Sequence, residues 1–364
     1  MIITLSILDG FEHEIKSKVV EFTAHIQVTG FQNLPLGEHR SSLELVKKEV
    51  AGINAMAPFA AREGMIRSHD AVDGVLLKGI EPSTDAITPR YHLIEGTFFS
   101  EEGSVRQLVI GKKLALKLNA TVGDKLVVFA LPREQGGQPR AMQFILVGMY
   151  ESGMAEFDDI YAYTKLTDAQ ALFQLGDDIT GYDILVNDIT QVDEIAKHVQ
   201  QLLGYPHFAR TVFQMYHNLF SWVELQKKLS PVLLSLIILV ATINIIGTLL
   251  MFVLGKVGAI GILKSLGAAP GLIRRIFMLQ GLSIAMVGIV CGNLLAYAFC
   301  YLQLKFKLVM IPSEIYYMNA VPVLLKMENF LLVTAIAFIL CMLTTLLPSR
   351  AAAALNTVRA LRFG

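Results

Sequence analysis

The sequence predicts an α+β domain outside the cytoplasm that is joined to a bundle of transmembrane α-helices. Three observations lead to this fold class. Of the 364 residues, 54% are hydrophobic, and the long apolar runs all come after Ser230. Before Ser230, the charges, turn residues and short alternating segments are typical of a folded extramembrane domain. The segment between the first two long runs is basic and contains no acidic residue, which predicts a cytoplasmic loop.

Three uncharged runs are long enough to predict transmembrane helices. They cover residues 231–254, 276–304 and 330–347, which are 24, 29 and 18 residues long. A helix needs about 20 apolar residues to cross the hydrocarbon layer, so the third run is at the lower limit. None of the runs contains Asp, Glu, Lys, Arg or His. Their polar residues are expected to form hydrogen bonds between helices rather than a solute path; these are Asn244, Gln280 and Asn293.

Charges in the connecting segments predict the orientation of these helices. The segment 255–275 carries four basic residues, Lys256, Lys264, Arg274 and Arg275, and the segment after Pro348 is also basic. The segment 305–329 instead mixes three lysines with two glutamates. Because short Lys/Arg-rich loops stay in the cytoplasm, we expect a cytoplasmic C-terminus and an exported domain over residues 11–230.

Residues 1–10 are expected to be the outer remnant of a further helix. An exported domain needs a signal peptide or a preceding span, but the apolar stretch Met1–Leu8 is too short to serve as either. We therefore expect that the inner part of a first span is missing from this sequence. An unusual topology is the alternative.

The exported domain is predicted to be α+β because helices and strands alternate without a regular β-α-β rhythm. Its expected elements are a helix that ends near Asn119, a helix capped by Thr167 that ends at Gly176, and several strands. The strands include residues 24–31, 74–82, 125–131 and 141–150.

Two segments of this domain suggest a function. Residues 132–140 form a polar hairpin tip with a proline near each end. Residues 211–230 are amphipathic and lead directly into the first complete span. A helix that continues into a span can transmit movement, and a passive linker is the alternative.

No enzyme is predicted. The chain has no G-x-x-x-x-G-K-[ST] phosphate loop and no G-x-S-x-G motif, and its eight histidines are scattered. The cluster "EFDD" at 156–159 is interpreted as a solvated turn. The three cysteines, Cys291, Cys300 and Cys341, lie in the spans and are interpreted as packing residues. No cofactor or metal is expected in this chain.

Several stretches resemble the FtsX/MacB-type ABC transporter permeases. The string "GAIGILKSLGAAPGLIRRIFMLQG" (258–281) is similar to a loop and the following span of that group. Other stretches resemble the lipoprotein-releasing permeases, LolC and LolE, in particular. They are "LSILDGFE" (5–12), "GVLLKGIEP" (74–82), "GMAEFDDIYAYTKLTDAQALFQLGDDITGYDILVND" (153–188), "LIILVATINIIGTLLMFVLGK" (236–256), "IPSEIYYMNAVPV" (311–323) and "PSRAAAALNTVRALR" (348–362).

The resemblance implies four spans, with a MacB-like outer domain between the first and the second and an FtsX-like permease domain at 231–364. It implies a coupling helix that receives the motion of a separate ATPase dimer, which binds ATP and Mg. The resemblance assigns contact with the ATPase to Lys256, Ile260, Leu263, Lys264, Leu266, Arg274 and Arg275. The family usually has an acidic residue where Ala259 stands, so coupling would rest on packing and on the two lysines.

Two further sites follow from the resemblance. The outer hairpin, with Pro132, Arg133, Pro139 and Arg140, would engage a periplasmic lipoprotein carrier or the lipoprotein itself. A cavity between two permease copies, identical or related, would take the acyl chains. The residues implied for that cavity are Asn244, Ile245, Leu249 and Phe252.

The expected function is that of a non-catalytic inner-membrane subunit that extracts lipoproteins and passes them to the carrier. Two alternatives stay open within the wider group. One is MacB-like export of peptides or drugs, and the other is FtsX-like control of a cell-wall hydrolase. A third alternative, an enzymatic outer domain, has no supporting constellation of residues.

Overall fold

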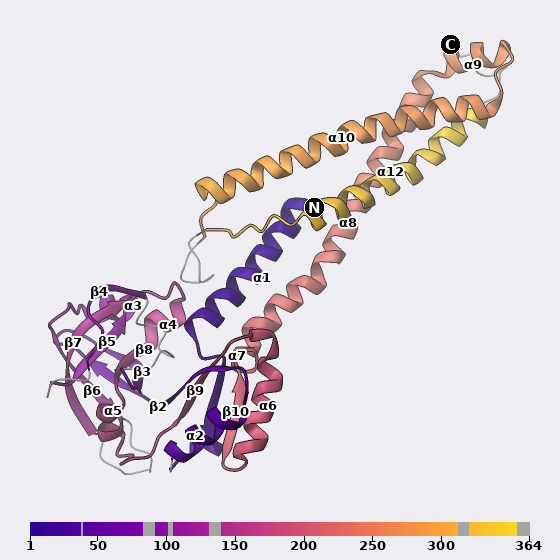
Figure 1. Cartoon of the computed structure of the whole chain (residues 1–364). Helices are drawn as coiled ribbons and strands as arrows, with labels where there is room; N and C mark the ends of the chain where they lie inside the picture. The colour runs from indigo at the N-terminus through magenta and orange to yellow at the C-terminus, as the bar shows by residue number, and fades with distance from the viewer. Residues whose placement is uncertain (38, 83–91, 101–104, 131–139, 312–319, 355–364) are drawn as a thin grey trace. The chain divides into compact units, whose positions relative to one another are not determined.

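The computed structural model describes residues 1–37, 39–82, 92–100, 105–130, 140–311 and 320–354 (Figure 1). These residues form two compact units. The helical unit contains Met1–His13, Ser221–Met310 and the C-terminal part from Ala320, and the sheet domain contains Glu14–Phe220. Helices α1 (Ile2–Phe22) and α8 (His217–Gly255) each cross the boundary between the units, so they connect the two.

The sheet domain is built on one ten-stranded sheet. Its main strand order is β10-β1-β9-β2-β3-β8-β5-β7-β4, and β6 pairs with β2 and β7. The strands are β1 (Ile26–Gly30), β2 (Ile53–Arg67), β3 (Val72–Ile80), β4 (Leu93–Gly96), β5 (Gln107–Gly111), β6 (Lys125–Ala130), β7 (Arg140–Tyr150), β8 (Tyr161–Lys165), β9 (Gly181–Val186) and β10 (His207–Thr211). Two neighbouring pairs are parallel, β3/β8 and β5/β7, and the other pairs are antiparallel. This mixed sheet confirms the α+β prediction.

Short helices cover the sheet and enclose its core. Figure 1 shows α2 and α6 beside β9 and β10 at one end of the sheet, and α3, α4 and α5 at the other. Helix α6 buries Val192, Ile195, Ala196 and Val199, a spacing that places them on one helical face. The short helices and helical turns are η1 (Phe31–Asn33), α2 (His39–Glu49), α3 (Lys112–Leu118), α4 (Ala155–Ile160), α5 (Leu166–Phe173), η3 (Ile189–Gln191), α6 (Val192–Leu203) and α7 (Val212–Met215).

Two local predictions for this domain need correction. Helix α5 begins at Leu166 with Lys165 as its N-cap, and it ends at Phe173, where Gln174 turns the chain with a φ of 57°. Thr167 is therefore inside the first turn, because strand β8 leads directly into the helix. The "EFDD" segment is not a solvated turn either. It lies in α4, and Asp158 is 2% exposed and accepts hydrogen bonds from the N–H and Oγ of Ser152, each at 2.7 Å.

The helical unit contains the three long apolar helices that the sequence predicts. Among the described residues, His217–Gly255, Pro270–Phe306 and Met327–Arg350 are long and apolar enough to cross a membrane. The third lies in α12 (Met327–Ala354), and the short α9 (Val257–Ser265) separates α8 from α10 (Pro270–Phe306).

Helices α10 and α12 pack side by side through small and polar residues. A Cβ atom placed on Gly281 would lie 2.5 Å from Cγ2 of Thr345, so only glycine allows this close approach. Asn293 Nδ2 donates to Thr334 Oγ1 at 2.9 Å, which confirms the prediction of an interhelical hydrogen bond at Asn293.

Candidate functional site

The coupling segment, residues 255–275, begins where α8 ends. Lys256 is the N-cap of α9, and the chain turns after α9 at Gly267, whose φ of +90° favours glycine. Pro270 occupies the first turn of α10, where a missing N–H costs no hydrogen bond. A short helix, α9, is therefore present in the segment where the resemblance implies a coupling helix, and α10 begins at Pro270.

One side of the coupling segment is buried against the ends of the long helices. Ile260 is 1% exposed and packs with Val253 of α8, Ile273 of α10 and Ala352 of α12. Lys264 Nζ donates to the carbonyl oxygen of Ala353 at 2.8 Å, at the last turn of α12, where the helix dipole favours a positive charge. Both residues therefore fix the position of α9 relative to the long helices.

The other side of the coupling segment is exposed. Leu263 is 40% and Leu266 is 79% exposed, and the side chains of Lys256, Arg274 and Arg275 are exposed as well. A small cavity of about 180 Å³ lies beside them. Its lining includes Phe252, Lys256, Ala259, Ile260, Leu263 and Phe277. The segment thus presents exposed leucines, a basic rim and a shallow hollow at the position of Ala259.

The four residues implied for an acyl-chain cavity lie along α8. Asn244 is exposed, whereas Ile245 and Leu249 are half-buried. Leu249 comes close to Gly281 of α10, and Phe252 lines the small cavity of the coupling segment. The structure therefore brings Phe252 together with the coupling residues Lys256, Ile260 and Leu263.

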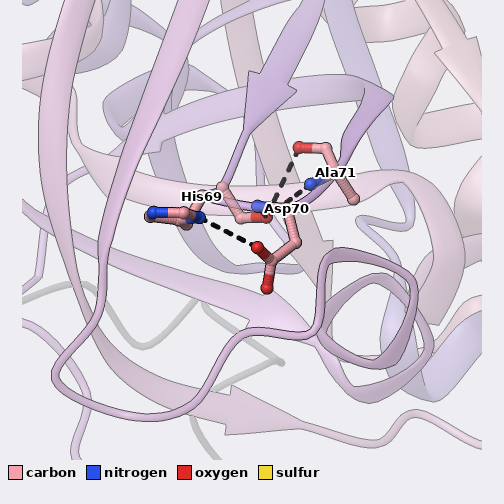
Figure 2. Close-up of polar contacts among 4 residues, drawn as sticks. His69, Asp70 and Ala71 are labelled. Carbon is pink, nitrogen blue, oxygen red and sulfur yellow. Dashed lines mark hydrogen bonds and ion pairs between the residues drawn. The ribbon is translucent and has the colours of Figure 1, made fainter.

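The predicted hairpin lies mostly outside the described residues, which include Arg140 but not Pro132, Arg133 or Pro139. Arg140 starts β7, and its Nη1 donates to the carbonyl oxygen of Ala171 at 3.1 Å. A second hairpin, between β2 and β3, is fully described. Figure 2 shows its tip, where His69 Nδ1 lies 2.9 Å from Asp70 Oδ1. The His69 side chain is 98% exposed, so this pair lies in solvent, and hydrogen bonds between Ser68 and Ala71 close the turn.

A polar clamp in the helical unit was not predicted. Asp9 Oδ2 of α1 accepts a hydrogen bond from Asn329 Nδ2 at 2.6 Å and pairs with Lys326 at 3.5 Å. One helical turn later, Glu12 pairs with Lys227 of α8. Between the two, a Cβ on Gly10 would lie 2.6 Å from the carbonyl oxygen of Pro322. The two separated motifs "LSILDGFE" and "VPV" therefore touch through their backbones, and this explains the glycine.

A second unpredicted feature is a groove on the sheet, which we call the sheet groove. It is about 720 Å³ in volume and lies on the face opposite to the core. Its floor consists of two sets of directly paired residues on neighbouring strands. Gln27 (β1) is paired with both Arg210 (β10) and Asp183 (β9), and Lys78 (β3) is paired with both Ala61 (β2) and Tyr163 (β8). The two sets are offset by four residues along β2, where Asp183 is paired with Ala57. Lys78 and Asp183 join them by an ion pair over β2, with side chains only 13% and 10% exposed.

Further contacts hold this ion pair in place. Lys78 Nζ lies 4.5 Å from the centre of the Phe59 ring, and Asp183 accepts a hydrogen bond from Gln27 Nε2 at 3.2 Å. A charged residue within the otherwise apolar strand "GVLLKGI" is the sequence signal that points to this site. Within the described residues, no cluster of three or more His, Cys, Asp or Glu side chains could hold a metal ion.

An α+β domain joined to apolar membrane helices by two long helices, with a short basic helix between the first two spans, defines an ABC-transporter permease. The family models agree with this class. Residues 1–202 match the MacB-like periplasmic core domain, and residues 231–357 match the FtsX-like permease C-terminal domain. The first match covers more than half of the 364 residues. The chain therefore belongs to the MacB/FtsX-type family of permeases.

Within that family, the similarity to lipoprotein-releasing permeases extends over the whole chain. The lipoprotein-releasing system transmembrane protein LolC of Xylella fastidiosa (strain 9a5c) is 26% identical, and the match covers 100% of this chain and 90% of the relative. LolE of Haemophilus influenzae is 25% identical over 99% of this chain and 90% of its own length. The macrolide export protein MacB of Bdellovibrio bacteriovorus is 26% identical, but the match covers 70% of this chain and 40% of MacB.

Proposed function

We propose that this chain is the membrane subunit of an ABC-type complex that extracts lipoproteins from the inner membrane and delivers them to a periplasmic carrier. The single observation that carries the proposal is the similarity to LolC and LolE over the full chain, both sheet domain and helices. The chain itself does no chemistry in this proposal. A separate cytoplasmic ATPase dimer binds ATP and Mg, and a second permease copy, identical or related, completes the complex.

The coupling segment has the properties that an ATPase contact needs. Leu263 and Leu266 offer exposed apolar area, and Lys256, Arg274 and Arg275 surround it with positive charge. The buried Ile260 and the hydrogen-bonded Lys264 connect this surface to the ends of α8, α10 and α12. A force on α9 is therefore applied to three membrane helices at once.

Energy input is physically required for extraction. Each CH₂ group withdrawn from the bilayer costs about 0.8 kcal/mol, so several acyl chains cannot leave at a useful rate without work. In this proposal, ATP binding moves α9, the helices transmit the motion, and the sheet domain passes the lipoprotein on. In the same proposal, the sheet domain and the predicted hairpin at 132–140 lie in the periplasm, and the C-terminus lies in the cytoplasm.

The test uses the full chain in liposomes with its ATPase, a triacylated lipoprotein and a soluble carrier. Lipoprotein should appear on the carrier only when both ATP and carrier are present. Leu266→Asp should reduce release at least tenfold while the ATPase still hydrolyses ATP, because an exposed apolar contact is lost without damage to the fold. Leu116→Asp, at a 69% exposed leucine of α3, is the matched control and should release normally.

The possible outcomes separate the proposal from its alternatives. Normal release by Leu266→Asp would show that this leucine does not contact the ATPase. ATP hydrolysis without any release in the unmodified complex would contradict lipoprotein extraction. It would favour MacB-like export or FtsX-like transmission of movement.

A further inference from the structure

We propose that the sheet groove binds an extended segment of polypeptide, namely the part of a lipoprotein that connects its acylated end to its folded domain. This inference rests on the proposed function. It adds a second substrate site, located in the sheet domain and separate from the site of the acyl chains.

The length of the groove favours an extended chain. Its floor runs from Arg210 on β10 to Tyr163 on β8, across β1, β9, β2 and β3. Neighbouring strands are about 4.8 Å apart, so these five steps measure about 24 Å along the sheet. An extended polypeptide rises about 3.3 Å per residue, and about seven residues fit this distance. A compact small molecule would occupy only part of it.

The lining chemistry suits a peptide backbone, which has both donors and acceptors. The central Lys78–Asp183 pair is neutral as a unit, and three side-chain amides and several hydroxyl groups line the same groove. The amides are those of Gln27, Gln32 and Asn33. Arg210 Nε is buried and has no hydrogen-bond partner among the described residues, although its guanidinium lies over the ring of Phe208. A peptide carbonyl would satisfy this N–H, and an acyl chain would not.

The aromatic end of the groove lies at the connections to the helical unit. Phe157 is 4.9 Å from Phe22, 5.1 Å from Tyr161 and 6.0 Å from Tyr216, measured between ring centres. Phe22 is the last residue of α1, and Tyr216 immediately precedes α8. Both helices continue from this point into the helical unit. The aromatic end of the groove therefore lies next to the residues at which α1 ends and α8 begins.

The experiment is photo-crosslinking from inside the groove. Benzoylphenylalanine replaces Tyr161 at the aromatic end, Leu76 in the floor, or, as a control, the exposed Leu116 of α3. The full complex in liposomes is illuminated during release of a triacylated lipoprotein. Crosslinks from Tyr161 and Leu76 are expected to map to the first residues after the acylated cysteine, with none from Leu116. Release without crosslinks, or crosslinks to the acyl chains, would overturn the inference.

A matched pair of arginine variants tests the role of Arg210. Arg67 also stacks on an aromatic ring of the same sheet, that of Phe129, but it does not line the groove. Arg210→Ala should raise the lipoprotein concentration needed for half-maximal release about tenfold, the effect of losing one hydrogen bond from a charged group. Arg67→Ala should change it less than about twofold. Equal effects of the two variants would contradict peptide binding at Arg210.

A synthetic linker peptide without acyl chains distinguishes this inference from the proposed function. The peptide is crosslinked to the full chain in detergent, where no release is required. Crosslinks at Leu76 together with a failure of release would refute lipoprotein extraction and retain the groove as a peptide site. Normal release of the lipoprotein with no peptide or lipoprotein crosslinks would refute the groove and retain the function.

Discussion

Breaking the Lys78–Asp183 ion pair should destabilise the sheet domain strongly, and the two single variants should differ. Removing one partner of a buried pair leaves an uncompensated charge and costs about 3–5 kcal/mol. Among the described residues, Lys78→Met leaves the Asp183 carboxylate with the Gln27 amide at 3.2 Å, so we expect a loss of about 3 kcal/mol. Asp183→Asn keeps an acceptor and leaves Lys78 over the Phe59 ring, 4.5 Å from its centre, so about 2 kcal/mol is expected.

Thermal unfolding of the full chain in detergent measures these losses. For a domain of this size, 1 kcal/mol corresponds to about 2–4 °C, so Lys78→Met should lower the melting temperature by about 6–12 °C. The double variant Lys78→Met/Asp183→Asn removes both charges, so it should lose less stability than the sum of the two single losses. Additive losses, or a shift below about 1 °C for Lys78→Met, would refute a buried and coupled pair.

Two further predictions test the fold. Burial lowers the pKa of His25, whose Nδ1 accepts a backbone hydrogen bond. Its stabilising effect is therefore complete above pH 6.5 and is lost as the pH falls through the lowered pKa. The melting temperature of His25→Gln should depend less on pH between 7.5 and 5 than that of His69→Gln, and equal slopes of the two variants would contradict this. Gly10→Ala should displace the Pro322 backbone and lower the melting temperature of the helical unit by several degrees, whereas Gly292→Ala, where an added Cβ meets nothing within 4 Å, should not.

The sequence was sufficient to predict features that depend on local composition. Uncharged length predicted the three long helices, and the basic stretch without acidic residues predicted the connecting segment 255–275, which contains α9. These features are encoded within about 20 consecutive residues, where hydrophobicity and backbone preferences decide the structure without help from distant parts of the chain. The prediction for Asn293 succeeded because a polar side chain within an apolar helix needs a partner on another helix.

The sites that the sequence did not predict depend on pairing between distant segments. Gln27 lies beside Asp183 and Arg210 only because β1 is paired with both β9 and β10, and no local pattern specifies those registers. The clamp likewise joins Asp9 to Asn329, across 320 positions of sequence. The burial of Asp158 was missed for a similar reason, because its carboxylate is enclosed by surrounding structure that the four letters "EFDD" do not contain.

Helix α8 is the element best suited to carry movement through the helical unit. It is 39 residues long, which at 1.5 Å per residue is about 58 Å. At one end Val253 packs on the buried Ile260 of α9, and near the other end Lys227 pairs with Glu12 of α1. A displacement of α9 by a partner therefore acts on α8 through a packed core, and α8 acts on α1 through an ion pair. Because α1 and α8 are also the two chain connections to the sheet domain, the Glu12–Lys227 pair joins both connections within the helical unit.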